Sequence, residues 1–137
     1  MNLDAIPWQP TRYPGIDVHF YASDRSSGRA LALIRMAPGC FYPRHRHRGE
    51  EHLLVVQGGY RDERGVHRAG EFARYGDGTD HAPIAVDEPG APACVLLALA
   101  HEGIQLLGSE RLGGLRPPSA VTASRTRPAP SRRCSAA

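Results

Sequence analysis

Glycine and proline divide this sequence into short pieces, and that spacing limits the folds that the chain can adopt. The chain holds 15 Gly and 12 Pro in 137 residues, and the pieces between them are too short for most helices. Within the pieces, apolar residues do not recur at the three- and four-residue intervals of an amphipathic helix. The pattern therefore predicts an all-β fold.

The pieces that we expect to form strands are rich in apolar and β-branched residues. These predicted strands span residues 17–21, 29–37, 51–57, 66–68, 71–75, 81–86 and 94–100. The polar segment 61–65 is typical of a hairpin loop. Residues 31–34 and 53–56 are apolar at every position, which indicates strands covered on one face by an opposite sheet and on the other by a partner subunit or the N-terminal residues. We therefore expect a homodimer.

The charge of the chain argues against some classes of partner. The formal net charge is +3, and all 17 basic side chains are arginine. The arginines beyond residue 116 have no acidic residue beside them, so the body is near neutral, which gives little support to binding of nucleic acid or a membrane. The longest uninterrupted apolar run, residues 93–100, is far too short to cross a bilayer, and residues 1–10 lack the layout of a signal peptide. We expect a cytoplasmic protein.

The cysteines give no sign of a disulfide framework or a cysteine zinc site. They form an odd set of three, Cys40, Cys94 and Cys134, without CxxC spacing. We expect reduced thiols, with Cys134 the most reactive because it lies in a polar tail.

A group of histidines and glutamates is the strongest chemical signal in the sequence. His45 and His47 are two residues apart, so in an extended strand both side chains project to the same face. Glu51 shares that face if the strand continues without a bulge, and Glu50 would replace it if a bulge shifted the register. His81 opens another predicted strand after a turn with two glycines. Imidazoles with one carboxylate suit Fe, Mn, Zn, Ni or Cu, and these residues are our candidate metal ligands.

The same segment resembles the first motif of the cupin superfamily. That motif is Gly, five residues, His-x-His, three or four residues, Glu, six residues, Gly. The sequence meets every fixed position of it: Gly39, His45, His47, Glu51 and Gly58.

The second cupin motif is met in part. Gly70, Gly78 and His81 occupy fixed positions, whereas Gly76 stands where proline is usual and Ala85 where asparagine is usual. Together with the Gly-Glu-Glu that follows the His-x-His pair, the DE-x-G loop and the short gap between the motifs make the sequence similar to the ChrR-type branch of cupins.

The resemblance, which covers about residues 29–108, implies a double-stranded β-helix barrel of jelly-roll type. His45, His47, Glu51 and His81 would hold one divalent metal in it, most simply Fe, Zn or Mn. We expect one domain in three parts: an N-terminal arm and first strand (1–28), the metal-binding barrel (29–108) and a C-terminal segment (109–137). Residues 1–15 read as an arm whose Trp8 and Tyr13 pack on the body, and we expect disorder from about residue 117.

The resemblance leaves three functions open. A metal with free coordination positions could act with oxygen on a small organic substrate, as in a metal-dependent dioxygenase, which is our leading hypothesis. A ChrR-like barrel could instead sense oxidants or a small ligand and report through a regulatory protein partner. In the anti-sigma members of the family, the cupin follows a sigma-binding domain with its own His and Cys zinc ligands. Residues 1–28 contain no such cluster, so we expect the sigma-binding half to be missing. A zinc ion held by four protein ligands could also serve stability alone.

The remaining histidines and aromatics have simpler interpretations. We expect His52 on an outer or interface face. Surface or core positions are expected for the isolated histidines: His19, His67 and His101. Most aromatic residues near the motifs are expected to pack, although Tyr60 and Tyr75 could donate a hydrogen bond or a proton to a ligand. No catalytic acid or base can be assigned, and the sequence shows no Ser-His-Asp order, P-loop or dinucleotide-binding glycine pattern.

Overall fold

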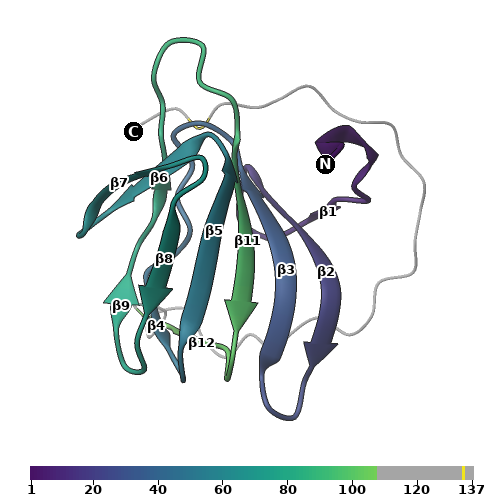
Figure 1. The fold of residues 1–137 in the computed structure, drawn as a ribbon, viewed down its shortest axis with the longest axis vertical. Coiled ribbons are helices and arrows are strands. Elements are labelled where there is room, and N and C mark those ends of the chain that lie inside the picture. The colour runs from purple at the N-terminus through teal and green to yellow at the C-terminus, as the bar shows by residue number, and fades with distance from the viewer. Residues whose placement is uncertain (108–133, 135–137) are drawn as a thin grey trace.

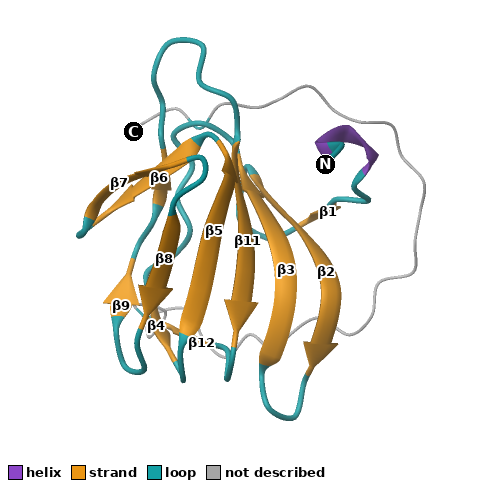
Figure 2. Cartoon of the chain, viewed as in Figure 1, coloured by secondary structure: helices purple, strands orange, loops and turns teal. Residues whose placement is uncertain are grey.

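The computed structural model describes residues 1–107 and 134, and strands dominate that part of the chain (Figure 2). One short 3-10 helix, η1 (Leu3–Ala5), lies near the N-terminus. The largest sheet has six antiparallel strands in the order β1–β2–β3–β11–β5–β8. Its strands are β1 (Gln9–Pro10), β2 (Ile16–Asp24), β3 (Arg29–Met36), β11 (Cys94–Ala100), β5 (Glu51–Gln57) and β8 (Phe72–Tyr75).

Two antiparallel three-stranded sheets complete the fold, in the orders β10–β6–β7 and β12–β4–β9. Their strands are β10 (Ile84–Ala85), β6 (Gly59–Asp62), β7 (Gly65–Arg68), β12 (Ile104–Leu106), β4 (His45–His47) and β9 (Asp80–His81). In Figure 1, β4 and β12 lie behind the lower end of the six-stranded sheet. The buried core joins Leu53 and Leu96 of the large sheet to Tyr60 and Ala85 of a small one. The all-β, jelly-roll prediction is confirmed.

Several predicted strands coincide with observed ones. The predictions at 51–57 and 94–100 match β5 and β11. The hairpin predicted around 61–65 is present between β6 and β7, but its loop is only residues 63–64, because Arg61, Asp62 and Gly65 belong to the strands. The single strand predicted over 81–86 is wrong, because the chain there forms β9 and β10, which belong to different sheets. Pro83 lies between the two and has no N–H to donate to a ladder.

The segment that carries the histidine motif bends instead of running on as one strand. β4 ends at His47, Gly49 adopts a φ of +65°, and β5 begins at Glu51 in another sheet. A positive φ strains any residue with a Cβ, so glycine suits this turn. The premise of an unbroken strand from His45 to Glu51 is therefore wrong, and Glu51 comes from the facing sheet.

The N-terminal residues pack on the large sheet as an arm. β1 pairs with β2, and the ring of Trp8 lies 4.5 Å from the guanidinium carbon of Arg35. The indole N–H of Trp8 donates to the carbonyl of Leu3 (3.0 Å). The ring centre of Tyr13 lies 6.0 Å from that of Tyr42. Both aromatics of the arm thus contact the body, as predicted.

The expectation of three reduced thiols is wrong. Cys40 and Cys134 form a disulfide between residues 94 positions apart, while Cys94 is a free, buried thiol whose pKa burial raises to about 12. Spacing rules miss such a bond because the two cysteines meet only in the folded chain. The disorder expected from about residue 117 concerns residues that, apart from Cys134, lie outside the described part.

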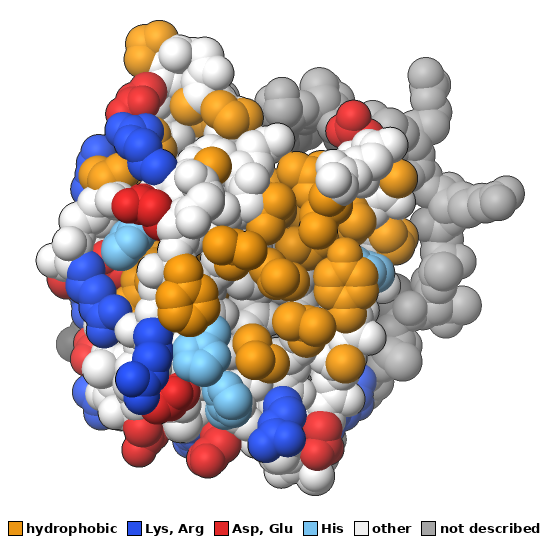
Figure 3. All heavy atoms as spheres, in the orientation of Figure 1, with side chains coloured by type: hydrophobic (Ala, Val, Ile, Leu, Met, Phe, Trp, Pro, Cys, Tyr) orange, Lys and Arg blue, Asp and Glu red, His pale blue; other side chains and the backbone are white. Residues whose placement is uncertain are grey.

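The two faces of the six-stranded sheet carry different side chains. Its outer face, seen in Figure 3, gathers an apolar patch over β8, β5, β11 and β3 that includes Leu54 and Phe72, 38% and 63% exposed. Its inner face holds the core. Among the described residues, no helix is long and apolar enough to span a membrane.

Candidate metal centre

Four buried side chains meet between the sheets at one end of the core. His45 and His47 come from β4, His81 from β9 and Glu51 from the start of β5, and their exposed fractions are 4%, 1%, 2% and 8%. One candidate ligand atom from each lies within 4.8 Å of the other three. His45 is the register partner of His81, which sets these two side chains next to each other. All four residues proposed from the sequence are brought together.

In His45 and His81, Nδ1 faces a hydrogen-bond acceptor. Nδ1 of His45 donates to the carbonyl of Pro43 (2.8 Å), and Nδ1 of His81 donates to the carboxylate of Asp62 (2.9 Å). Neither acceptor has a proton to give, so each neutral imidazole carries its proton on Nδ1. Nε2 of both rings is therefore a bare lone pair.

His47 is held in the same tautomer. The hydroxyl of Thr79 donates to the carbonyl of Gly76 (2.6 Å), so its oxygen is left to accept from Nδ1 of His47 (3.1 Å). Nε2 of His47 is buried and makes no hydrogen bond to any described residue. It lies 2.7 Å from a carboxylate oxygen of Glu51, another acceptor.

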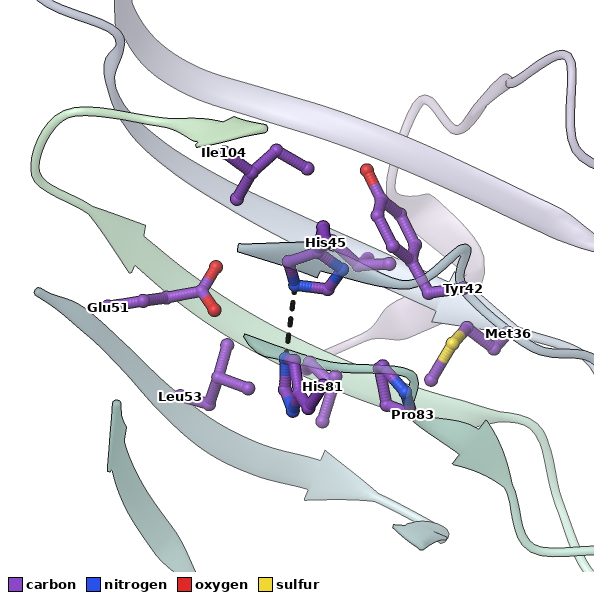
Figure 4. Close-up of a pocket in the computed structure, with 10 residues that line it drawn as sticks. Met36, Tyr42, His45, Glu51, Leu53, His81, Pro83 and Ile104 are labelled. Atoms are coloured by element: carbon purple, nitrogen blue, oxygen red, sulfur yellow. Dashed lines mark hydrogen bonds between the residues drawn. The ribbon is translucent and has the colours of Figure 1, made fainter. Parts of the chain in front are cut away.

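Lone pairs thus converge on one point without a proton between them. The Nε2 atoms of His45 and His81 are 3.0 Å apart, shown as a dashed line in Figure 4. Glu51 points toward the same space from the facing strand. Acceptors at such distances repel one another unless a cation lies among them. The donor set, with second nitrogens fixed by hydrogen bonds, fits a divalent metal.

Burial favours the neutral form of His45 and His81, the form in which an imidazole binds a metal. Desolvation lowers the pKa of His45 to about 4, against a smaller opposite effect of its hydrogen bond to Pro43. Desolvation also lowers the pKa of His81, opposed by the hydrogen bond to Asp62. A proton is therefore a poor occupant of the gap between the two rings at neutral pH.

Asp62 anchors the outer side of His81. Its side chain is fully buried, and its carboxylate accepts from Nδ1 of His81 (2.9 Å), the hydroxyl of Tyr75 (2.5 Å), the backbone N–H of Arg64 (2.9 Å) and Nε2 of His67 (3.2 Å). Burial alone would raise the pKa of Asp62, but these hydrogen bonds outweigh it and lower the pKa to about 2. The carboxylate is ionised and holds the imidazole in place.

Tyr60 and Tyr75 extend this network away from the ligand atoms. Because the hydroxyl of Tyr75 donates to Asp62, it accepts from that of Tyr60 (2.7 Å). Burial raises the pKa of both hydroxyls. The ring of Tyr75 packs on His81, with centres 4.2 Å apart. In this structure the two hydroxyls bond each other and Asp62, so they support the ligands and do not point at a substrate.

A family model described as the ChrR cupin-like domain matches residues 1–99. This chain belongs to that family. The search of curated proteins finds no match. The family assignment agrees with the two cupin motifs and with the four buried side chains that they bring together.

Several solved structures are similar to this ChrR-type cupin. A chain from the complex of SigE with the anti-sigma ChrR of Rhodobacter sphaeroides is 28% identical, with a TM-score of 0.61, covering 72% of this chain and 50% of that one. This chain thus spans about half the length of that relative. An RmlC-like cupin from Ralstonia eutropha is 22% identical, with a TM-score of 0.68, covering 80% of this chain and 71% of that one. An acetylacetone dioxygenase from Acinetobacter johnsonii is 13% identical, with a TM-score of 0.63, covering 74% of this chain and 72% of that one. The latter two show the fold alone.

Two cavities adjoin the ligand candidates His45, Glu51 and His81 of this ChrR-type cupin, and His47 lines neither. A small one of about 40 Å³, drawn in Figure 4, is lined by His45, Glu51 and His81 with apolar neighbours. A larger one of about 320 Å³ extends along the inner face of β2, β3 and β11 and includes Tyr42 and Glu51 in its lining. The metal candidates therefore border a space that a small molecule can enter.

The alternative ligands considered from the sequence lie elsewhere. Glu50 points outward, where it pairs with Arg74 and lies 3.2 Å from His52. His52 packs beside His101, with ring centres 5.2 Å apart. Glu51, and not Glu50, therefore joins the cluster.

Sequence reasoning missed Asp62 and Thr79 as partners of the ligands. Asp62 is the first residue of the DE-x-G loop, which marked the family without revealing a role. Thr79 precedes His81 by two residues, yet it bonds His47 from the other strand. Such contacts depend on pairing between strands, which motif spacing does not encode.

Proposed function

We propose that this protein is a metal-dependent dioxygenase that acts on a small organic molecule able to chelate the metal. The observation that carries the proposal is the convergence of three bare imidazole nitrogens and one carboxylate in a buried site that borders a cavity. The likeness of the fold to an acetylacetone dioxygenase is consistent with it.

His45, His47, Glu51 and His81 would hold the metal, and their donor atoms suit Fe, Mn, Zn, Ni or Cu. Iron is our choice, because imidazoles with a carboxylate and open positions are typical of non-haem iron oxygenases. When bound, such a metal supplies a Lewis acid and a site for oxygen beside a chelating substrate. The protein contributes fixed ligand geometry and an apolar surrounding that excludes water.

The experiment combines metal analysis with oxygen uptake. Protein purified without added metal is analysed for its metal content, loaded with Fe²⁺, and tested for oxygen consumption with a panel of diketones and phenolic ketones. We expect substrate-dependent uptake that is lost in His47→Ala and kept in His52→Ala, a matched control outside the cluster. Tightly bound zinc without turnover on any substrate would contradict the proposal.

A regulatory function is the second candidate, and two observations favour it. The chain is 28% identical to part of the SigE–ChrR complex, and a disulfide links Cys40, two residues from the cavity-lining Tyr42, to Cys134. In this alternative an oxidant or small ligand changes binding of a regulatory protein. Co-purification with a sigma factor that is lost on oxidant treatment would support it.

The location of the protein stays a prediction. The sequence led us to expect the cytoplasm, whereas disulfides are typical of oxidising compartments.

We also propose that two copies associate through the outer face of the six-stranded sheet. That face has an apolar centre with Leu54 and Phe72 exposed, and the ion pair Arg35–Asp17 joins the neighbouring strands β3 and β2 of the same sheet. An apolar centre with charges of both signs beside it suits a second copy of itself. Light scattering should give a dimer that Leu54→Glu converts to a monomer. A monomeric wild type would refute this.

A further inference from the structure

The larger cavity exists because the inner face of two central strands is lined by alanine. Along β3 the inward residues include Ala30 and Ala32, and along β11 they include Ala98 and Ala100. The register pairs Ala32 with Ala98 and Ala30 with Ala100. The small side chains are therefore adjacent and form one floor.

The same strands carry large residues on the opposite face. Leucine alternates with alanine in both, as in Leu31 and Leu33 of β3 and Leu97 and Leu99 of β11. Successive side chains of a strand point to opposite faces, so the small residues are inside and the large ones outside. In a filled interior, the large side chains would usually point inward and the small ones outward. The inward alanines thus leave an empty volume that larger side chains would fill.

This alanine floor leads directly to the candidate metal ligands. Ala100 is the register partner of Glu51, whose carboxylate belongs to the ligand cluster. Ile34, Tyr42, Glu51 and Ile104 line both the large cavity and the small one at the ligands. At the other end, Phe20 lines the large cavity and is 51% exposed, so the cavity reaches the surface there.

The lining is almost wholly apolar. Glu51 is the one charged residue in it, and the hydroxyl of Thr11 is already bonded to the carbonyl of Ile16 (2.8 Å). The hydroxyl of Tyr42 has no hydrogen-bond partner among the described residues, and a phenol hydroxyl can donate to a ligand. It is the polar group that remains available to a ligand at the junction of the two cavities.

The volume sets the size of the ligand. An apolar cavity of about 150 Å³ holds one benzene ring, so a cavity of about 320 Å³ has room for roughly ten non-hydrogen atoms. A charged body would lie unpaired in apolar surroundings, which is costly, whereas methylene or aromatic carbons gain by leaving water.

We propose that the alanine-floored cavity is a binding site for the apolar body of the substrate. The substrate class is an uncharged molecule with a compact chelating head and an aliphatic or aromatic tail of several carbons. The head reaches the metal centre, Tyr42 hydrogen-bonds a polar atom at the junction, and the tail lies over the alanines of β3 and β11. This assignment rests on the proposed function, because it places the head at the metal.

The test uses two diketones of different length and the full chain loaded with Zn²⁺, which does not react with oxygen. Pentane-2,4-dione carries the head alone, and nonane-2,4-dione adds four methylenes. Calorimetric titration should show nonane-2,4-dione binding at least about 50-fold tighter, since each buried methylene is worth up to about fourfold. Ala98→Leu should remove most of that advantage while leaving affinity for pentane-2,4-dione within about twofold.

Further variants keep the test informative if Ala98→Leu fails to fold. Ala100→Leu fills the cavity at its other end, beside Glu51, and Ala22→Leu makes the same change at an exposed position of β2. The first should remove the chain-length advantage and the second should keep it. Equal affinity for the two diketones in the wild type, or an advantage that survives both cavity variants, would overturn the assignment while leaving the metal centre standing. Failure of the wild type to retain Zn²⁺ would overturn both.

Discussion

The two halves of the space between the sheets are built in opposite ways. One half is filled, with Tyr60 and Cys94 fully buried and Val55 2% exposed. The other half is hollow, with a floor of alanines and four polar side chains whose converging acceptor atoms repel one another unless a cation lies among them. The same strands pass through both, and β11 runs from Cys94 at the filled end to Ala100 at the hollow end. Side-chain size along a strand thus separates the part that stabilises the fold from the part available for binding.

Acid should destabilise the hollow half first. The pKa of His45 is about 4 in the folded protein and about 6.5 when unfolded, so between these values the unfolded chain binds the proton and the folded one does not. The metal-free protein should lose about 3 kcal/mol of its free energy of unfolding as the pH falls from 6.5 to 4.

Urea unfolding at a series of pH values measures this effect. His45→Phe removes the titrating group and should flatten the dependence over that range. His52→Ala changes a partly exposed histidine and should leave the pH dependence of unfolding unchanged. An equally steep dependence in His45→Phe would show that other groups are responsible.

A cavity in the filled half should cost stability without affecting the metal. Val55→Ala removes two buried methyl groups, and we expect unfolding to become easier by about 2 kcal/mol. Zinc affinity of the folded protein should stay within twofold, because Val55 lines neither cavity. Loss of zinc binding together with stability would mean that the two halves are not separable in this way.

Asp62→Asn should weaken metal binding without removing a ligand. The amide gives His81 a weaker acceptor than the carboxylate, and loss of such an outer partner typically costs about 10- to 100-fold in metal affinity. Asp80→Asn is the matched control, because Asp80 neighbours His81 in sequence but pairs with Arg44 at the surface. Competition with a zinc chelator measures both. Equal affinities for the two variants would remove the supporting role of Asp62.

Partial filling of the hollow half should have the smallest effect on stability. Ala32→Val adds two methyl groups beside the cavity, and we expect the free energy of unfolding to change by less than about 1 kcal/mol. Thermal unfolding followed by circular dichroism is sufficient to measure it. A loss as large as that of Val55→Ala would show that the alanine floor is closely packed.

The sequence predicts a good part of this fold and site, for identifiable reasons. The Gly and Pro spacing predicts the all-β class, and the motif spacing selects His45, His47, Glu51 and His81, which the structure brings together. Local patterns fail where distant contacts decide. The Cys40–Cys134 disulfide and the Asp62 network both join residues that are far from their partners along the chain or lie on other strands.

The turn at Gly49 is a further case. Strand parity selected Glu51 for a reason that does not hold, because the chain bends before that residue. The alternation of alanine and leucine in β3 and β11 is visible in the sequence, but it does not by itself tell which face is inside. That face is fixed only by the position of Glu51 and its register with Ala100.

The central claim is that the four convergent side chains bind one cation, and metal content per chain tests it most directly. Wild-type protein equilibrated with Fe²⁺, Zn²⁺ or Mn²⁺ and freed of excess metal should retain one ion per chain. The same treatment should leave His47→Ala nearly metal-free and His52→Ala fully loaded. A wild type that retains none of these ions, or a His47→Ala variant that retains as much as the wild type, would contradict the account.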